Sequence, residues 1–312
     1  MFYFVHTDGI KRSKSPSGAR LGAFRATALT MRTFNVGDGE AILLSRGAEG
    51  VLFDGGAGRK KVNEPLARAL AAYLAQEKIR LRALVATHPH LDHLNALSAL
   101  LAVDDPPSLA ADTVLYHNGE AMGRYLSETL GARMNALSRS GRLAVEPVTT
   151  GMEGRGLAGV EMYHFVDGRS KPGPEYKSIS TLAWYGSASF LFTGDAYAEY
   201  EADLLASPVG GLLRADVLKV THHGSEHGTS QPFVDAVLPR ISVASTAADA
   251  GHRLENVIKA RLEKVGEVFD TFGRGGDVIV STDGKASTRR TGTGVLYEVR
   301  VETPGWYLGG TW

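Results

Sequence analysis

The stretch "ATHPHLDHLNAL", residues 86–97, places three of the ten histidines of this 312-residue chain and one aspartate within six consecutive positions. His88 and His90 are two positions apart, so in an extended backbone their imidazoles point to the same side. Pro89 favours this geometry, because it pushes the preceding residue toward extended conformations and fixes its own φ. The sequence therefore predicts that the two imidazoles bind one metal ion together.

Asp92 and His93 follow at once, where the apolar segment "LNALSALLA" is expected to turn into a helix. Their side chains can face a second point a few ångströms away. Imidazole and carboxylate are the expected ligands of Zn²⁺, with bonds of about 2.0–2.2 Å, and two ions about 3.5–4 Å apart form a hydrolytic pair. We therefore expect two divalent ions, zinc in the first place and manganese as the alternative.

Two further segments end apolar strands with side chains that bind metals. "SFLFTGD" ends at Asp195, and "ADVLKVTHHGS" delivers His222 and His223. A single aspartate after glycine is usually a turn residue, and a single histidine is usually a solvated loop residue. Because both segments repeat the strand-exit pattern of "ALVATHPH", the joint pattern favours ligands that meet at one site.

The remaining pattern alternates strands and helices. Apolar runs punctuated by glycine predict an antiparallel meander over residues 26–56, and helical spacing follows over 63–79 before a buried strand at 81–88. Further strands and helices are expected, with strands near 111–117, 142–148, 158–166, 179–186, 187–195, 215–224, 240–246, 267–272 and 277–284, and helices near 119–141, 196–206, 230–237 and 253–264. Two sheets packed face to face with helices outside give an α/β fold, a four-layer αββα sandwich.

This pattern covers residues 24–285 as one hydrolase domain. Residues 1–23 are expected to form an N-terminal extension, and residues 286–312 a C-terminal tail able to add an edge strand.

Composition restricts the classes of function. The 34 basic and 34 acidic residues balance, so no overall field would attract nucleic acid or an acidic membrane, and a polyanion would have to be held locally. The chain has no cysteine, which excludes disulfides and thiolate-bound metals. Without a secretory signal or a run of roughly 18 apolar residues, we expect a cytoplasmic protein with no membrane partner.

The motif His88, His90, Asp92 and His93 resembles the H-x-H-x-D-H signature of the metallo-β-lactamase superfamily. Within it, "FNVGDGEAILL", "VLFDGG", "THPHLDH", "FLFTGD" and "DVLKVTHHGS" occur in the order seen in the metallo-hydrolase domain of ComEC-type DNA-uptake proteins and their soluble relatives. The resemblance, over about residues 28–285, implies an αββα fold and two metals, with Asp195 bridging them and a histidine of "HHGS" on the second. Such relatives usually carry Gly-Gly after the signature, where this chain has "HLNAL".

The resemblance also suggests roles for residues outside the signature. His164 stands where superfamily members often supply a third histidine to the first ion, and His117 is the alternative. His252 matches a late histidine that can contact phosphate or protonate a leaving group.

Two kinds of site residue complete the prediction from the sequence. Asp54 is expected to accept a hydrogen bond from a ligand imidazole, unless it is a plain turn residue. Hydroxyl groups that can contact phosphate, or simply begin a helix, belong to Ser225, Thr229 and Ser230.

The function expected from these features is hydrolysis by a hydroxide that bridges two metal ions, with Asp92 and Asp195 as catalytic ligands and Asp195 guiding the proton. The leading substrate is a phosphodiester in DNA, RNA or a nucleotide, which would make the protein a phosphodiesterase or nuclease. The alternatives are hydrolysis of carbon esters, lactones or β-lactams with the same metals, and a non-catalytic metal-binding interaction module. The fold alone does not choose among them.

Overall fold

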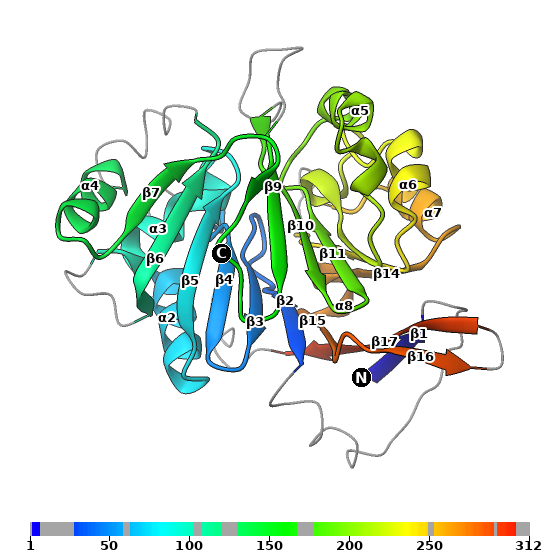
Figure 1. Ribbon diagram of the computed structural model, residues 1–312, viewed down its shortest axis with the longest axis horizontal. Coiled ribbons are helices and arrows are strands. Elements are labelled where there is room, and N and C mark those ends of the chain that lie inside the picture. The colour runs from blue at the N-terminus through cyan, green and yellow to red at the C-terminus, as the bar shows by residue number, and fades with distance from the viewer. Residues whose placement is uncertain are drawn as a thin grey trace.

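The computed structural model describes residues 2–6, 28–58, 63–102, 108–119, 130–166, 177–248, 253–289 and 292–303. Within these ranges two β-sheets pack face to face, and helices cover the outer surface of each sheet (Figure 1). This confirms the predicted α/β sandwich with four αββα layers.

The first sheet has ten strands within the described ranges. Nine follow in the order β1 (Phe2–His6), β17 (Gly292–Glu302), β15 (Asp277–Thr282), β2 (Leu29–Thr33), β3 (Ile42–Arg46), β4 (Glu49–Phe53), β5 (Arg80–Ala86), β6 (Leu109–His117) and β7 (Ala144–Pro147), and β16 (Ala286–Arg289) pairs with β17. The predicted meander is confirmed, because β2, β3 and β4 are antiparallel neighbours. From β4 to β7 the strands run parallel, so the chain leaves β5 at one defined edge of the sheet.

The second sheet has seven strands within the same ranges. Their order is β14 (Glu267–Asp270), β13 (Ile241–Ala244), β12 (Val217–Lys219), β11 (Ala188–Phe192), β10 (Ser180–Tyr185), β9 (Glu161–Phe165) and β8 (Met152–Glu153). Strands β11 and β12 are parallel neighbours. The carboxyl ends of parallel strands meet at the same edge of a sheet, so the segments that follow β11 and β12 lie side by side.

Three apolar clusters hold the four layers together. The inner cluster combines residues of both sheets, and it includes the stacked rings of Phe53 and Phe192, whose centroids are 4.1 Å apart. The two outer clusters attach the helices. In α2, for example, Leu66, Leu70 and Leu74 recur every four residues and are buried, because residues at this spacing share one helix face.

The helices divide between the two outer surfaces (Figure 1). The first sheet is covered by α2 (Glu64–Gln76), α3 (Leu91–Leu100) and α4 (Ala132–Arg139), and the second by α5 (Ala198–Ala206), α6 (Gln231–Val237) and α7 (Asn256–Leu262). Short helical turns complete the set at η3 (Gly210–Leu212), η4 (Thr221–Gly224) and α8 (Thr271–Arg274). None of the helices in the described ranges is long and apolar enough to cross a membrane.

The terminal segments take places in the first sheet that the sequence did not specify. The sequence indicates only that the tail can add an edge strand; in the structure β17 lies between β15 and β1, β16 pairs with β17, and β1 from the N-terminal extension is the strand at the end of the sheet. The strand predicted over 267–272 ends at Asp270, whose side chain accepts from the backbone of Gly273 and begins α8. Of the helix predicted over 119–141, residues 120–129 lie outside the described residues.

Candidate metal centre

The centre lies where the loops after β5, β11 and β12 meet. His88 and His90 follow β5, and His90 precedes α3 with an extended backbone of φ −83° and ψ 150°. Their ring centroids are 4.6 Å apart. The structure thus places these two imidazoles together, as the His-Pro-His spacing predicts.

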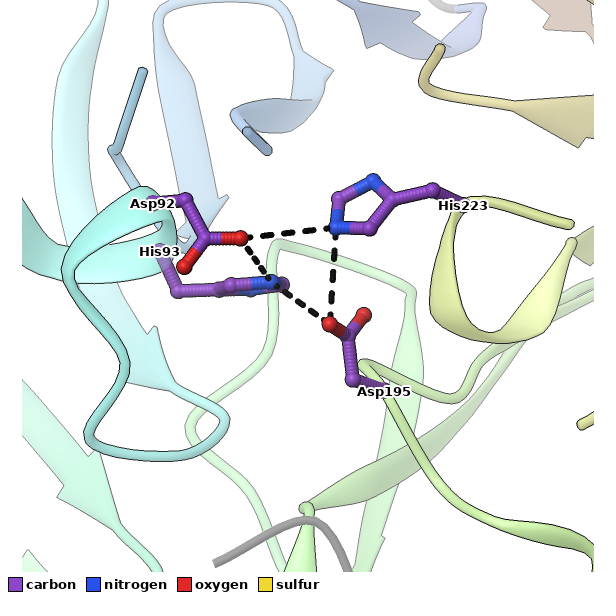
Figure 2. A group of neighbouring side chains, drawn as sticks. All are labelled: Asp92, His93, Asp195 and His223. Carbon is purple, nitrogen blue, oxygen red and sulfur yellow. Dashed lines mark hydrogen bonds and ion pairs between the residues drawn. The ribbon is translucent and has the colours of Figure 1, made fainter. Parts of the chain in front are cut away.

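Asp92, His93, Asp195 and His223 form a compact group whose donor atoms all lie within 4.8 Å of one another (Figure 2). Asp195 Oδ2 is 3.0 Å from His93 Nε2 and 3.4 Å from His223 Nε2. Asp92 Oδ2 lies 3.6 Å and 3.7 Å from the same two nitrogens. Ligands bound tetrahedrally at about 2.0–2.2 Å are separated by roughly 3.3–3.6 Å, so this group has the spacing of a shared cation.

Two more imidazoles approach the same carboxylate oxygen. The Nε2 atoms of His88 and His222 are each 3.8 Å from Asp195 Oδ2. His88 is buried, and its Nε2 makes no hydrogen bond to any described residue. A buried nitrogen with no hydrogen bond, among neutral and anionic donors, fits a site that takes a divalent cation.

Asp54 lies directly behind His93. Its Oδ2 is 2.7 Å from His93 Nδ1, and its two oxygens accept from the backbone N–H and the hydroxyl of Thr87 at 2.8 Å and 2.7 Å. With its Nδ1 engaged, His93 directs its Nε2 toward Asp195. Asp54 thus makes the contact with an imidazole that the sequence predicts. A carboxylate at Nδ1 fixes the orientation of an imidazole that binds a metal.

An unusual backbone turns the two adjacent histidines toward Asp195. His222 and His223 have φ values of 49° and 55°, a left-handed conformation that costs on the order of 1–3 kcal/mol for a residue other than glycine. The Nδ1 atom of His223 donates to the carbonyl of Ser245 at 3.0 Å, which leaves its Nε2 directed at the carboxylates. The ring of His222 stacks on Tyr197, at 5.1 Å between centroids.

Electrostatics divides the histidines into two kinds. Burial disfavours the charged form of His93, but Asp195, Asp54 and Asp92 raise its pKa well above the ordinary value. His223 behaves similarly, because Asp195 outweighs burial and raises its pKa. Burial lowers the pKa of His222 to about 4, so this imidazole is neutral at pH 7, the form that binds metals.

Where the resemblance leads one to expect a Gly-Gly pair after the signature, this chain has Asn95, which lies against the loop after β4. Asn95 accepts from the backbone of Ala57 at 3.0 Å and donates to its carbonyl at 2.8 Å. Gly56 lies so near that an added Cβ would be 2.2 Å from the carbonyl oxygen of Asp92. In this chain the amide of Asn95 therefore ties the loop after β4 to the start of α3.

Sequence reasoning missed two buried charges beside the centre, Glu40 and Lys219. Lys219 is fully buried, with Nζ 2.5 Å from Glu40 Oε2 and 3.6 Å from Asp195 Oδ1. Burial lowers the pKa of Lys219, but Glu40 and Asp195 outweigh burial and raise it, so the side chain is a cation. The only signal in the sequence is a lysine inside the apolar strand "DVLKV".

The other two histidines proposed for the first ion lie outside this group. His164 is fully buried, its Nδ1 is 2.8 Å from the hydroxyl of Thr181, and its ring packs on Tyr116. His117 Nδ1 accepts from the backbone of Gly119 at 3.2 Å. Neither belongs to a group of close metal-binding donors among the described residues, so a ligand role for either stays a prediction without geometric support.

The predicted substrate contacts have mixed surroundings. Thr229 is fully buried, and its backbone N–H donates to Glu201 at 2.6 Å, while that of Ser230 donates to the same carboxylate at 2.8 Å. These contacts involve only the backbone amides, so a substrate contact by either hydroxyl stays a prediction. Ser225 is half-buried and accepts from the backbone of His227 at 3.3 Å. His252 lies outside the described residues.

Comparison with known proteins agrees with this geometry. Residues 35–247 match the family model described as the metallo-beta-lactamase superfamily. The chain is 27% identical over 182 residues to "ComE operon protein 3" of Bacillus subtilis, which covers 57% of this chain and 22% of that protein. It is also 27% identical over 214 residues to "Recombination protein 2" of Haemophilus influenzae, over 69% of this chain and 24% of that protein. The chain thus spans less than a quarter of either relative.

A solved structure shows the same fold. The metallo-beta-lactamase fold protein YhfI from Bacillus subtilis matches with a TM-score of 0.51 and 13% identity, over 77% of this chain and 96% of that chain. At this identity the likeness concerns the fold alone.

Proposed function

We propose, since this chain belongs to the metallo-beta-lactamase superfamily of metal-dependent hydrolases, that it is a phosphodiesterase acting on nucleic acid or nucleotides with two bound divalent cations. The observation that carries the proposal is a single carboxylate oxygen, Asp195 Oδ2, with four imidazole nitrogens within 3.8 Å. One oxygen shared by so many donors suits a carboxylate that bridges two ions.

The donors divide into two sets around Asp195. We assign His88 and His90 to the first ion, and Asp92, His93 and His223 to the second. His222 is a further candidate for the first ion, because its Nε2 lies as close to Asp195 Oδ2 as that of His88. His164 and His117 remain the alternatives that the sequence suggests. Zinc suits these nitrogen and oxygen donors best, with manganese as the alternative.

When bound, two divalent cations supply an activated water and neutralise charge on the attacked group. Asp195 would hold the shared position and accept or guide a proton there. Asp54 keeps the His93 ring fixed through the 2.7 Å contact at Nδ1. His252 is proposed as the general acid for the leaving group, and Ser225 as a hydroxyl near the phosphate.

Charge supports an anionic substrate. The carboxylates of Asp54, Asp92 and Asp195 would supply three negative charges against the four positive charges of two divalent cations, and Glu40 and Lys219 cancel each other. A phosphodiester gains from a site with this positive excess, whereas a neutral lactone gains less. The name of one relative, "Recombination protein 2", concerns nucleic acid and agrees with this choice.

A substrate screen tests the proposal. Protein reconstituted with zinc or manganese is assayed against bis-nitrophenyl phosphate, DNA, RNA and nucleotides, and in parallel against a lactone and a β-lactam. We expect cleavage of phosphodiesters and little turnover of the other substrates, with Asp195→Ala as the inactive control. Efficient lactone or β-lactam hydrolysis, with every phosphodiester left intact, would refute the proposal.

A further inference from the structure

A chain of polar contacts crosses between the two sheets beside the metal centre. On the side of the first sheet, Glu40 lies in the loop before β3, and its backbone N–H donates to the carbonyl of Asp92 at 2.9 Å. Its own carbonyl accepts from Gly56 at 2.9 Å. The backbone of Glu40 is therefore fixed to the segment that carries Asp92 and His93.

On the side of the second sheet, Lys219 is the last residue of β12. Its Nζ donates to the carbonyl of Gly194 at 2.7 Å and lies 3.6 Å from Asp195 Oδ1. The lysine thus contacts both the peptide before Asp195 and the carboxylate itself. Gly194 has a φ of 50°, and an added Cβ would be 2.2 Å from Ser178 Oγ. A residue with a side chain would therefore not fit directly before Asp195.

The two sides meet in the ion pair between Glu40 Oε2 and Lys219 Nζ, at 2.5 Å. A second contact crosses nearby, where Ser245 Oγ donates to the carbonyl of Gly39 at 2.8 Å and the carbonyl of Ser245 accepts from His223. The loop of residues 39–40 is therefore the point at which segments carrying Asp92, Asp195 and His223 are joined through the protein itself.

From this arrangement we propose that the Glu40–Lys219 ion pair is a positioning device, which sets the spacing between the two halves of the metal centre and orients Asp195 as a bridge. The proposal rests on the proposed function only in requiring that the centre binds two cations. It holds for any substrate.

The two oxygens of Asp195 have different neighbours. Oδ1 faces the Lys219 ammonium at 3.6 Å, while Oδ2 faces the four imidazoles. A cation beside Oδ1 keeps that oxygen from turning toward the ions, so only Oδ2 is offered to both. If the carboxylate could rotate, it could bind one ion through both oxygens and leave the other without its shared ligand.

Stability alone is a poor reason for this ion pair. Both side chains are at most 1% exposed, and removing two charges from water costs more than their attraction often returns. Apolar residues of similar volume are frequently as stable in such positions. The location between Asp92 and Asp195 gives the pair a different purpose.

The test replaces the pair while keeping the core filled. In the double variant Lys219→Met/Glu40→Leu, we expect a melting temperature close to that of the parent protein but metal affinity lowered about 10–100-fold, as for other outer partners of metal ligands. Isothermal titration with Mn²⁺ measures the affinity. Electron paramagnetic resonance of the Mn²⁺-loaded protein measures the coupling between two ions, which a merely structural role would leave unchanged.

A control far from the centre is the largely buried pair Arg32–Asp277 of the first sheet, at 2.8 Å, with side chains 11% and 0% exposed. The variant Arg32→Met/Asp277→Leu should bind Mn²⁺ with parent affinity and give the parent spectrum. Wild-type affinity and an unchanged spectrum in the Lys219→Met/Glu40→Leu protein would overturn the proposal.

A second variant covers the case in which the double variant does not fold. Glu40→Gln keeps the shape of the side chain and leaves the Lys219 ammonium without its ion-pair partner, with the Asp195 carboxylate still 3.6 Å away. We expect weaker Mn²⁺ binding and a changed spectrum. A Glu40→Gln protein that is only less heat-stable, with parent metal affinity, would show a purely structural pair. Two-ion binding by wild-type protein that cleaves no phosphodiester would refute the proposed function and leave this inference intact.

Discussion

His93 and His164 are both fully buried, and each engages its Nδ1 in a short contact, at 2.7 Å to Asp54 and 2.8 Å to Thr181. Their Nε2 atoms differ. The Nε2 atom of His93 faces Asp195 and Asp92. The Nε2 atom of His164 instead lies against Gly154, where an added Cβ would be only 2.2 Å from it, and it makes no hydrogen bond to a described residue.

The difference in neighbours reverses the electrostatics of the two histidines. Burial lowers the pKa of His164 to about 4, while the carboxylates around His93 overcome burial and raise its pKa well above the ordinary value. Burial alone therefore does not show whether a histidine has a functional role. The carboxylates that surround the ring decide whether it can serve a cation.

The largest change in metal affinity should follow from removing the charge of Asp195, the carboxylate that faces the Nε2 atom of His93. In Asp195→Asn the shared position loses its charge, so we expect metal affinity to fall by more than about 100-fold, beyond the effect of changing an outer partner, together with loss of hydrolysis. Elemental analysis after dialysis measures the bound metal. Retention of two ions per chain would exclude Asp195 as the bridging ligand.

A smaller effect should follow from changing the Nδ1 partners. Asp54→Asn removes the charge behind His93, and we expect metal affinity to fall about 10–100-fold, measured by titration against a chelator. Thr181→Val removes the equivalent partner of His164 and is the matched control, with unchanged affinity. An equal loss in both variants would instead place His164 among the ligands.

The smallest effect concerns stability against pH in protein treated with a chelator. The pKa of His164 is depressed, so the unfolded chain takes up a proton below pH 6.5 that the folded protein refuses, and stability falls by up to about 2 kcal/mol between pH 7 and pH 5. His93 has the opposite sign, because its raised pKa gives stability that is present below pH 6.5 and lost as pH rises through the folded value.

Denaturant unfolding of His164→Gln and His93→Gln measures these two contributions. Relative to the parent, His164→Gln should gain stability as the pH falls from 7 to 5, whereas His93→Gln should lose stability as the pH falls toward 6.5 from above. Parallel pH profiles in the two variants would contradict the opposite electrostatic surroundings described above.

The residues of the centre that belong to one motif or follow a predicted strand could be located from the sequence. His88 to His93 form one continuous motif with a proline that fixes the backbone, and Asp195 and His223 stand at strand ends. The Glu40–Lys219 pair could not be predicted, because it joins positions 179 residues apart across two sheets. A single lysine in an apolar strand gives no indication of which residue it pairs with.

The surroundings of His164 were equally hidden. Its place in the chain matches that of a ligand, but its ring direction is set by the pairing of β9 with β10, which places His164 opposite Thr181. The position of the tail strand also escaped prediction, because the sequence indicated a possible added strand without naming its neighbours, and β17 lies inside the sheet.

The pairing of β2 with β15 has a consequence for how the protein is made. Leu29 lies opposite Thr282 in the sheet, so as the chain leaves the ribosome, the open side of β2 has no partner until about 250 further residues have been synthesised. An uncovered strand edge invites pairing with other chains, and contacts so distant in sequence slow folding. The edge of β2 would therefore stay open to pairing with other chains until β15 has been synthesised.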